Sequence, residues 1–105
     1  MKPIIMSALL LGILSTSAFA GEWTGSIKIG LFQDETSLLD QVKVSMVDAV
    51  QIAEKALPGT VVKAELDKED GYLVYSVELA DKDGEEREAI IDPVIGSVLE
   101  KDKID

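Results

Sequence analysis

Residues 61–92 read VVKAELDKEDGYLVYSVELADKDGEEREAIID and contain three segments in which apolar and polar side chains alternate. This alternation is typical of strands that bury one face of a sheet. Two acidic sequences that end in glycine, KEDG and DKDG, separate the segments and suit tight turns. Because both connections are short, we expect neighbouring strands to pair antiparallel as a meander. A short fourth strand over residues 97–100 should follow the turn sequence DPVIG.

An amphipathic helix is predicted before these strands, over about residues 46–57. Ser45 stands three residues before Asp48, which is the spacing of a capping box, and the dipeptide PG at 58–59 ends the helical pattern. The apolar side chains of this segment form one stripe; they are Met46, Ala49, Val50, Ala53 and Leu57. Since one face of the meander is apolar and needs cover, we predict an α+β fold, with one amphipathic helix packed on a small antiparallel sheet of three to four strands.

The first twenty residues have the features of a cleaved export signal. Lys2 precedes an apolar stretch, and the sequence AFA at 18–20 is an A-x-A cleavage signature. The stretch is too short for a membrane-spanning helix, so we expect a mature chain that begins at Gly21 and does not insert into the membrane. No cysteine follows the stretch, which argues against a lipid anchor. The sequence therefore predicts a periplasmic or secreted protein.

Residues 21–41 are the hardest part of the chain to assign. Apolar residues alternate with polar ones from Trp23 to Leu31, but two glycines weaken the case for a strand. A short helical turn is expected over 34–41. We therefore divide the chain into a signal peptide over 1–20, a leader of uncertain order over 21–41 and a folded domain over 42–105.

The composition excludes several classes of function. The formal net charge is −10, and removal of residues 1–20 takes away only Lys2, which leaves 9 bases against 20 acids, or −11. Such a chain is repelled by nucleic acid and by anionic lipid, so neither is an expected partner. Histidine and cysteine are absent, which excludes disulfides, thiolate chemistry and histidine-based triads. A core of this size supplies about 3–5 kcal/mol, which leaves self-association open as a further source of stability.

The order of these motifs resembles the PepSY domain. The matching features run over about residues 42–101: PG at the helix end, VVKAEL, YLVYSVEL and REAIIDPVIGSVL, with an acidic turn before each of the last two. The resemblance implies a module that modulates, often by inhibition, a peptidase or another enzyme outside the cytoplasm. No protease domain follows in the chain, so we expect any inhibition to act on a separate protein.

The last predicted turn departs from the family pattern. Family members usually carry aspartate, a small residue, a polar residue, threonine and glycine there, whereas this chain has DPVIG over residues 92–96. Ile95 takes the threonine position, so Val94 and Ile95 place two apolar side chains where solvent is expected. We interpret them either as packing under the helix end or as a contact for a partner.

The acidic turns do not match a metal site or a catalytic site. A calcium-binding helix-loop-helix motif needs glycine at loop position 6, and counting from Asp81 places Glu86 there. Carboxylates at hairpin tips cannot exclude water, and the lysines stand at polar positions or in turns, so no enzymatic activity is expected. No metal and no other cofactor is predicted. The tip is interpreted first as turn chemistry, with weak cation binding as the alternative.

The expected partner surface is the face of the sheet that the helix leaves open. Tyr72, Val74 and Ile90 should point outward there and form a small apolar strip, with Asp83 on its acidic rim. The turn at Val94 and Ile95 is a further candidate contact. The first hypothesis is an exported interaction module that restrains a protein of the cell envelope, such as a peptidase. The alternative is a periplasmic accessory protein that binds a small ligand or a cation, or acts as a sensor.

Overall fold

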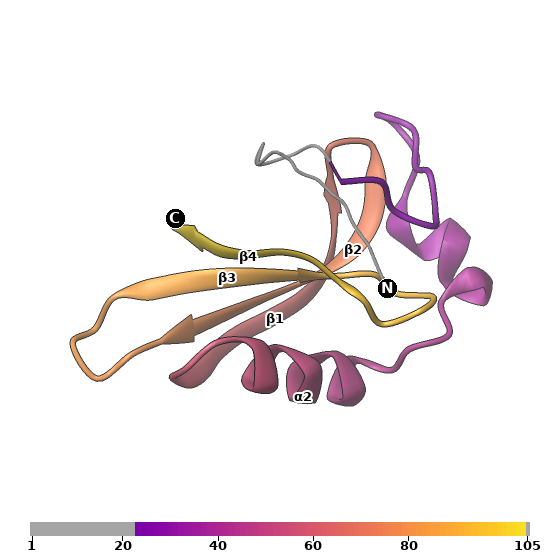
Figure 1. Ribbon diagram of the computed structural model, residues 1–105. Helices are drawn as coiled ribbons and strands as arrows, with labels where there is room; N and C mark the ends of the chain where they lie inside the picture. Colours follow the sequence, from indigo (N-terminus) through magenta and orange to yellow (C-terminus); the bar gives the residue numbers. More distant parts are fainter. Residues whose placement is uncertain (1–22, 105) are drawn as a thin grey trace, which may run out of the picture.

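The folded chain places its helices before a single antiparallel sheet. The computed structural model describes residues 23–104, so the predicted signal peptide and its cleavage site before Gly21 lie outside the described residues. The elements, in chain order, are the 3-10 helix η2 (Glu35–Gln41), helix α2 (Met46–Ala56), and strands β1 (Thr60–Glu69), β2 (Tyr72–Ala80), β3 (Glu86–Ile91) and β4 (Val98–Ile104). The strands follow the order β1-β2-β3-β4, and α2 packs against one face of the sheet (Figure 1). The predicted α+β class, with one main helix and then an antiparallel meander, is confirmed.

Helix α2 begins at the predicted cap. The Ser45 Oγ accepts a hydrogen bond of 3.1 Å from the Asp48 backbone N–H, which satisfies one of the free donors of the first turn. The helix ends at Ala56, one residue before the predicted end. Gly59 then adopts a φ of +121°, and a Cβ at this position would lie 2.6 Å from the Ala80 carbonyl oxygen. Only glycine therefore allows the chain to turn this close to β2.

The buried side of α2 differs from the predicted stripe. Ala49 and Ala53 are fully buried against the sheet, as expected, and Ile52 packs beside them. The prediction is wrong for Met46, which is 40% exposed, and Val50 is half-buried and outside the main cluster. The small alanines bring the helix close to the sheet, so the flank that carries Ile52 turns inward and the flank that carries Val50 turns partly outward.

The first hairpin is closed by a two-residue turn. Asp70 has a φ of 51° and Gly71 a φ of 86°, and the residues on either side, Glu69 and Tyr72, are paired across the ladder. Positive φ at both central residues is the signature of a type I′ turn, whose twist matches that of the strands. The turn sets the register, so residues of β2, and of β1 from Lys63 onward, reach the faces that their alternation predicts. A bulge between Val61 and Lys63 breaks the alternation at the start of β1, where Val61 packs against the core and Val62 is 53% exposed.

The core consists of two clusters. The main cluster lies between α2 and the sheet and contains Ala49, Ala53, Leu57, Tyr75, Val77, Leu79, Ala89 and Ile91. Within it, the Tyr75 hydroxyl donates a hydrogen bond of 2.7 Å to the Val44 carbonyl, and burial raises the pKa of Tyr75 above its ordinary value. The second cluster joins the N-terminal part of the chain to β2 and contains Ile27, Ile29, Leu38 and Leu73.

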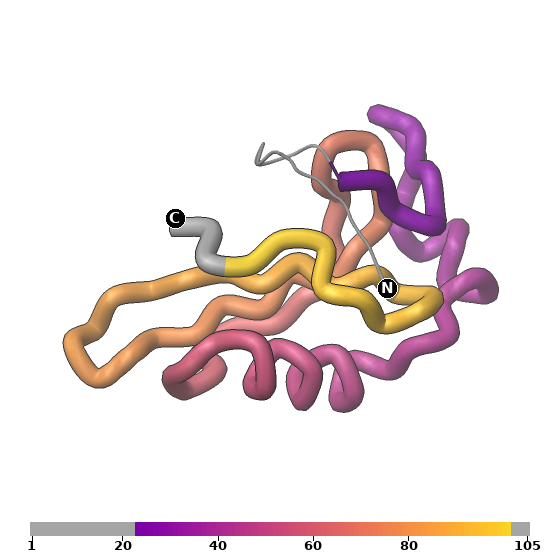
Figure 2. The backbone as a smooth tube through the Cα atoms, viewed as in Figure 1, coloured from indigo at the N-terminus to yellow at the C-terminus, as the bar shows by residue number. Residues whose placement is uncertain are grey.

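Residues 23–30 form an N-terminal strap that pairs with the beginning of β2. The Leu73 N–H donates to the Ile27 carbonyl at 2.9 Å, and the Ile29 N–H donates to the Gly71 carbonyl at 3.0 Å. Strand β3 reaches β2 only as far as Tyr75, so the strap takes the side of β2 that β3 leaves free. Figure 2 shows this segment beside the turn between β1 and β2.

Candidate interaction surface

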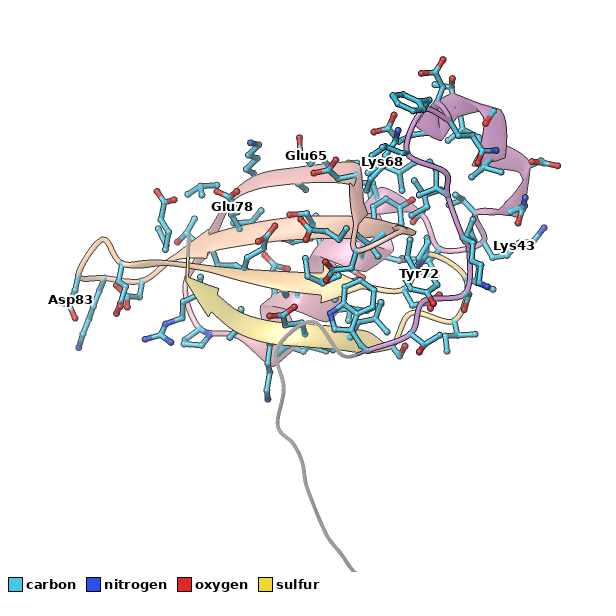
Figure 3. The ribbon with its side chains drawn as sticks, turned by 90° about the horizontal axis from the view of Figure 1, so that it is seen from above. Lys43, Glu65, Lys68, Tyr72, Glu78 and Asp83 are labelled. Carbon is cyan, nitrogen blue, oxygen red and sulfur yellow. The ribbon has the colours of Figure 1, made fainter. Side chains whose placement is uncertain are left out.

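The open face of the sheet, on the side away from α2, is mainly acidic. We define it by the side chains that the register places there: Lys63, Glu65, Asp67, Glu69, Tyr72, Val74, Ser76, Glu78, Glu88 and Ile90. Figure 3 looks down on this face, with the labelled Glu65, Tyr72 and Glu78 in view. Five of these ten side chains are carboxylates, of which that of Glu88 is buried, and one is a lysine. The four remaining carboxylates suit a basic partner.

The apolar strip expected on this face is not at the surface. Val74 and Ile90 are 0% and 1% exposed, so their expected exposure is wrong, and Tyr72 is half-buried. The strap lies against this end of the face, where a Cβ on Gly25 would be 2.9 Å from Tyr72. The ring centroid of Trp23 lies 5.8 Å from that of Tyr72, and the indole Nε1 donates a hydrogen bond of 3.0 Å to the carboxylate of Glu100, the register partner of Ile90. Trp23 thus connects β2 to β4 across the strand that carries Ile90.

A buried carboxylate, that of Asp92, anchors the strap. Its Oδ2 accepts hydrogen bonds from the Ser26 N–H at 3.0 Å and the Ser26 hydroxyl at 2.8 Å. Its Oδ1 accepts from the backbone N–H groups of Val94 at 2.8 Å and Ile95 at 3.2 Å. Asp92 itself is 1% exposed, whereas two of its partners, Ser26 and Ile95, lie at the surface, so the four hydrogen bonds are partly buried. An aspartate before Pro93 suggests a turn from sequence alone, but no local pattern signals its bonds to Ser26.

A second buried carboxylate lies on the open face. The Ser76 hydroxyl donates a hydrogen bond to the Glu88 carboxylate, and the two residues are 3% and 5% exposed. Buried polar groups require such partners, and this pair links β2 to β3. A substrate could not reach a serine this deeply buried, so the pair stabilises the sheet. Within residues 23–104, no group of three or more acidic side chains is arranged to hold a metal ion.

The acidic tip lies far from the other predicted contacts. Asp81 Oδ1 accepts the backbone N–H groups of Asp83 at 2.9 Å and Glu85 at 3.0 Å, so this carboxylate organises the turn between β2 and β3. Asp83 itself is exposed, and Figure 3 shows it at the opposite end of the face from Tyr72. The structure therefore does not bring Asp83 and Tyr72 into one patch.

The turn between β3 and β4 separates its two apolar side chains. Val94 is half-buried against the second cluster, whereas Ile95 is 71% exposed. Val94 therefore packs inward, but against the second cluster and not under the end of α2, while a partner contact at Ile95 stays a prediction. The turn also lies close to α2, because a Cβ on Gly96 would lie 3.2 Å from the Ile52 Cδ1 atom.

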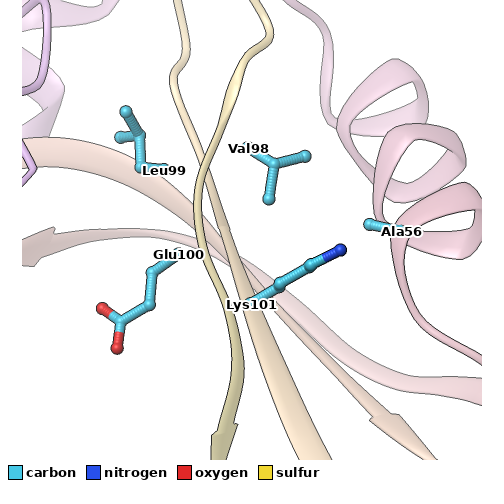
Figure 4. Close-up of a pocket in the computed structure, with 5 residues that line it drawn as sticks. All are labelled: Ala56, Val98, Leu99, Glu100 and Lys101. Atoms are coloured by element: carbon cyan, nitrogen blue, oxygen red, sulfur yellow. The ribbon is translucent and has the colours of Figure 1, made fainter. Parts of the chain in front are cut away.

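A shallow groove between α2 and β4 was not anticipated from the sequence. Its walls are Ala56, Val98, Leu99, Glu100 and Lys101. Figure 4 shows Val98 and Lys101 directed toward the helix, while Glu100 points to the other side of the strand. Val98 is 38% exposed, so the groove is a small apolar surface beside a cation. The short fourth strand was predicted, but its position relative to α2 depends on the tilt of the helix.

The fold and these surfaces define a small packed module whose accessible features suit contacts with another protein. The sequence model of the family described as "Peptidase propeptide and YPEB domain", PepSY, matches residues 43–102. The chain belongs to the PepSY family, and the predicted resemblance is confirmed. The match spans α2 and nearly all of the sheet, whereas the strap lies outside it.

Comparison with individual proteins adds one curated relative. The chain is 33% identical over 63 residues to the "Uncharacterized protein YkoJ" of Bacillus subtilis (strain 168). The aligned region covers 60% of this chain and 37% of that protein, so the chain spans little more than a third of the relative. No solved structure matches the chain. None of the helices within residues 23–104 is long and apolar enough to cross a membrane.

Proposed function

We propose that this protein is an exported, non-catalytic interaction module that modulates a peptidase or another enzyme of the cell envelope, with inhibition as the expected mode. The observation that carries the proposal is the extent of the family match: it covers the helix and the sheet together, so the complete packed unit is that of a peptidase-propeptide-like regulatory domain. Two of the buried acids, Asp92 and Glu88, have structural hydrogen bonds, which fits a module that binds without catalysing.

The cation-binding alternative has less support from the described residues. At the acidic tip, the carboxylate of Asp81 already accepts two backbone N–H groups. A cation would have to compete with these bonds. A protein partner can instead contact side chains that are already exposed, such as Ile95.

Modulation should be measurable with purified components. The mature chain, added in excess to a secreted thermolysin-like metallopeptidase, should lower the rate at which the enzyme hydrolyses a fluorogenic peptide. The matched control is the Ala53→Asp variant, which should be unfolded. It is a suitable control because an unfolded chain can slow the enzyme only as a competing substrate. Equal slowing by both proteins, with degradation of both, would contradict modulation by the folded module.

Export should remove the first twenty residues. We expect intact-mass analysis and N-terminal sequencing of the exported protein to give a chain beginning at Gly21, because the AFA sequence at 18–20 fits the cleavage enzyme. Ala18→Arg should block this step and leave the precursor uncut. A chain retained inside the cell at full length, or one starting many residues away from Gly21, would show that the N-terminal segment is misinterpreted.

A further inference from the structure

The outer edge of β1 is a second accessible feature of the sheet, distinct from its open face. Strand β1 is the first in the sheet order, and no described strand pairs with its outer side. Figure 3 shows it at the margin of the sheet, with Glu65 beside it and Lys68 close to the segment that contains η2. An edge strand presents unpaired backbone N–H and C=O groups, which is the arrangement that accepts an added strand.

The hydrogen bonds around Leu73 identify the outward-facing groups of β1. The Leu73 N–H donates to Ile27, away from β1, so the Lys68–Leu73 pair is a non-hydrogen-bonded pair of the antiparallel ladder. The Lys68 N–H agrees with this assignment, because it donates to the carboxylate of Asp67, at 2.8 Å, and not to β2. Because the two kinds of pair alternate, the backbone groups of Leu66 and Ala64 also point outward.

The edge is closed at one end and accessible at the other. The Lys68 N–H is satisfied by its neighbour Asp67, and the Lys68 ammonium donates a hydrogen bond of 3.2 Å to the Leu31 carbonyl. Those contacts occupy the end of β1 next to η2. The Leu66 side chain also packs against the second cluster. No described strand pairs with the rest of the edge, from the bulge near Val61 to Leu66. It is long enough for a short strand of about four to six residues.

The side chains along this edge differ on its two faces. On the open face, Glu65, Asp67 and Glu69 alternate along β1. On the side of α2, Ala64 and Leu66 are only half-buried. Val62, which lies in the bulge, is 53% exposed. A strand added here would place one set of its side chains beside carboxylates and the other set beside apolar groups.

We propose that the outer edge of β1 docks an extended segment of a partner protein, in which lysine or arginine alternates with apolar residues. The basic side chains pair with Asp67 and with Glu65, where they compete with the exposed ion pair of 3.8 Å that Lys63 forms with Glu65. The segment's backbone bonds to Ala64 and Leu66. This inference rests on the proposed function in one respect: the segment is taken to belong to the enzyme that the protein modulates. A second copy of this chain is the weaker occupant, because two mature chains of formal charge −11 repel each other.

Two synthetic peptides test the proposal. The probe is a capped nine-residue peptide that alternates lysine with valine, and its control has the same sequence but N-methylated valines, which removes backbone donors without changing the charge. Amide hydrogen exchange of the mature protein, followed by NMR, should show fast exchange at Ala64 and Leu66 in the free protein. The probe should slow both by about tenfold or more, and the N-methylated peptide should not.

Charge-reversal variants test the acidic face of the edge. Glu65→Lys should weaken binding of the probe about tenfold or more, since it places like charges beside each other. The matched control, Glu54→Lys, makes the same change on the exposed side of α2 and should leave binding within about twofold.

Equal binding of both peptides, or equal loss in both variants, would overturn the proposal by showing attraction by net charge alone. Slow exchange at Ala64 that depends on protein concentration would also overturn it and assign the edge to a second copy. None of these readouts depends on enzyme modulation, so the two proposals can fail separately.

Discussion

Ala53→Asp should unfold the protein. Ala53 is 0% exposed in the middle of α2 and lies within the main cluster, where a carboxylate would have neither water nor a partner. Burying an unpaired charge costs several kcal/mol, and a domain of this size has about 3–5 kcal/mol of stability to lose. We expect circular dichroism to show no cooperative thermal transition in this variant.

Val50→Asp is the matched control for this prediction. The two positions are three residues apart on the same helix, but Val50 is half-buried and outside the main cluster. Its carboxylate can reach water, so the variant should keep a cooperative transition at a lower midpoint. A cooperative melt of Ala53→Asp near the wild-type midpoint would show that α2 does not pack as described.

Asp92→Ala should cost about 3 kcal/mol or more of unfolding free energy. The substitution removes a buried carboxylate that accepts four hydrogen bonds, from Ser26, Val94 and Ile95, and hydrogen bonds to a charged group are the stronger ones. The same change frees the strap, so the environment of Trp23 should change as well. Trp23 is the single tryptophan of the chain, so its fluorescence reports the strap alone while urea unfolding reports the whole domain.

Two further variants make the Asp92 experiment specific. Asp92→Asn keeps one acceptor oxygen and replaces the other with an amide that cannot accept, so it should lose part of the stability that alanine loses. Asp83→Lys changes an exposed side chain at the hairpin tip and should alter the unfolding free energy by no more than about 0.5 kcal/mol. If Asp92→Ala unfolds at the same urea concentration as Asp83→Lys, Asp92 is not an anchor.

Local patterns predicted most of the fold. Alternation placed Tyr75, Val77 and Leu79 on the side of the helix, and the glycines of the two acidic turns set the hairpins. The cap at Ser45 was also visible, since it depends on neighbours within one helical turn. The stripe of α2 was less certain, because Val50 and Ile52 stand at equivalent distances from the buried alanines. Which of them faces the sheet depends on the tilt of the helix, and no local pattern records that tilt.

The candidate surface was predicted less well, because its main determinants are distant in the sequence. Alternation placed Val74 and Ile90 on the face opposite α2, but it could not show that this part of the face is covered. The bond from Trp23 to Glu100 joins residues 77 positions apart. The edge of β1 depends on the strand order and on which backbone groups point outward, and both become known only once the strands are paired.

The bond between Ser26 and Asp92 also bears on the order in which the chain can fold. It closes a loop of 66 residues, and closing so long a loop costs more chain entropy than forming either hairpin. The strap is synthesised first, but its anchor appears only when almost the whole domain exists. The hairpins and α2, whose contacts are more local, should therefore assemble early, and the strap should join last. Residues 23–30 thus remain without their tertiary contacts until the C-terminal part of the domain is in place.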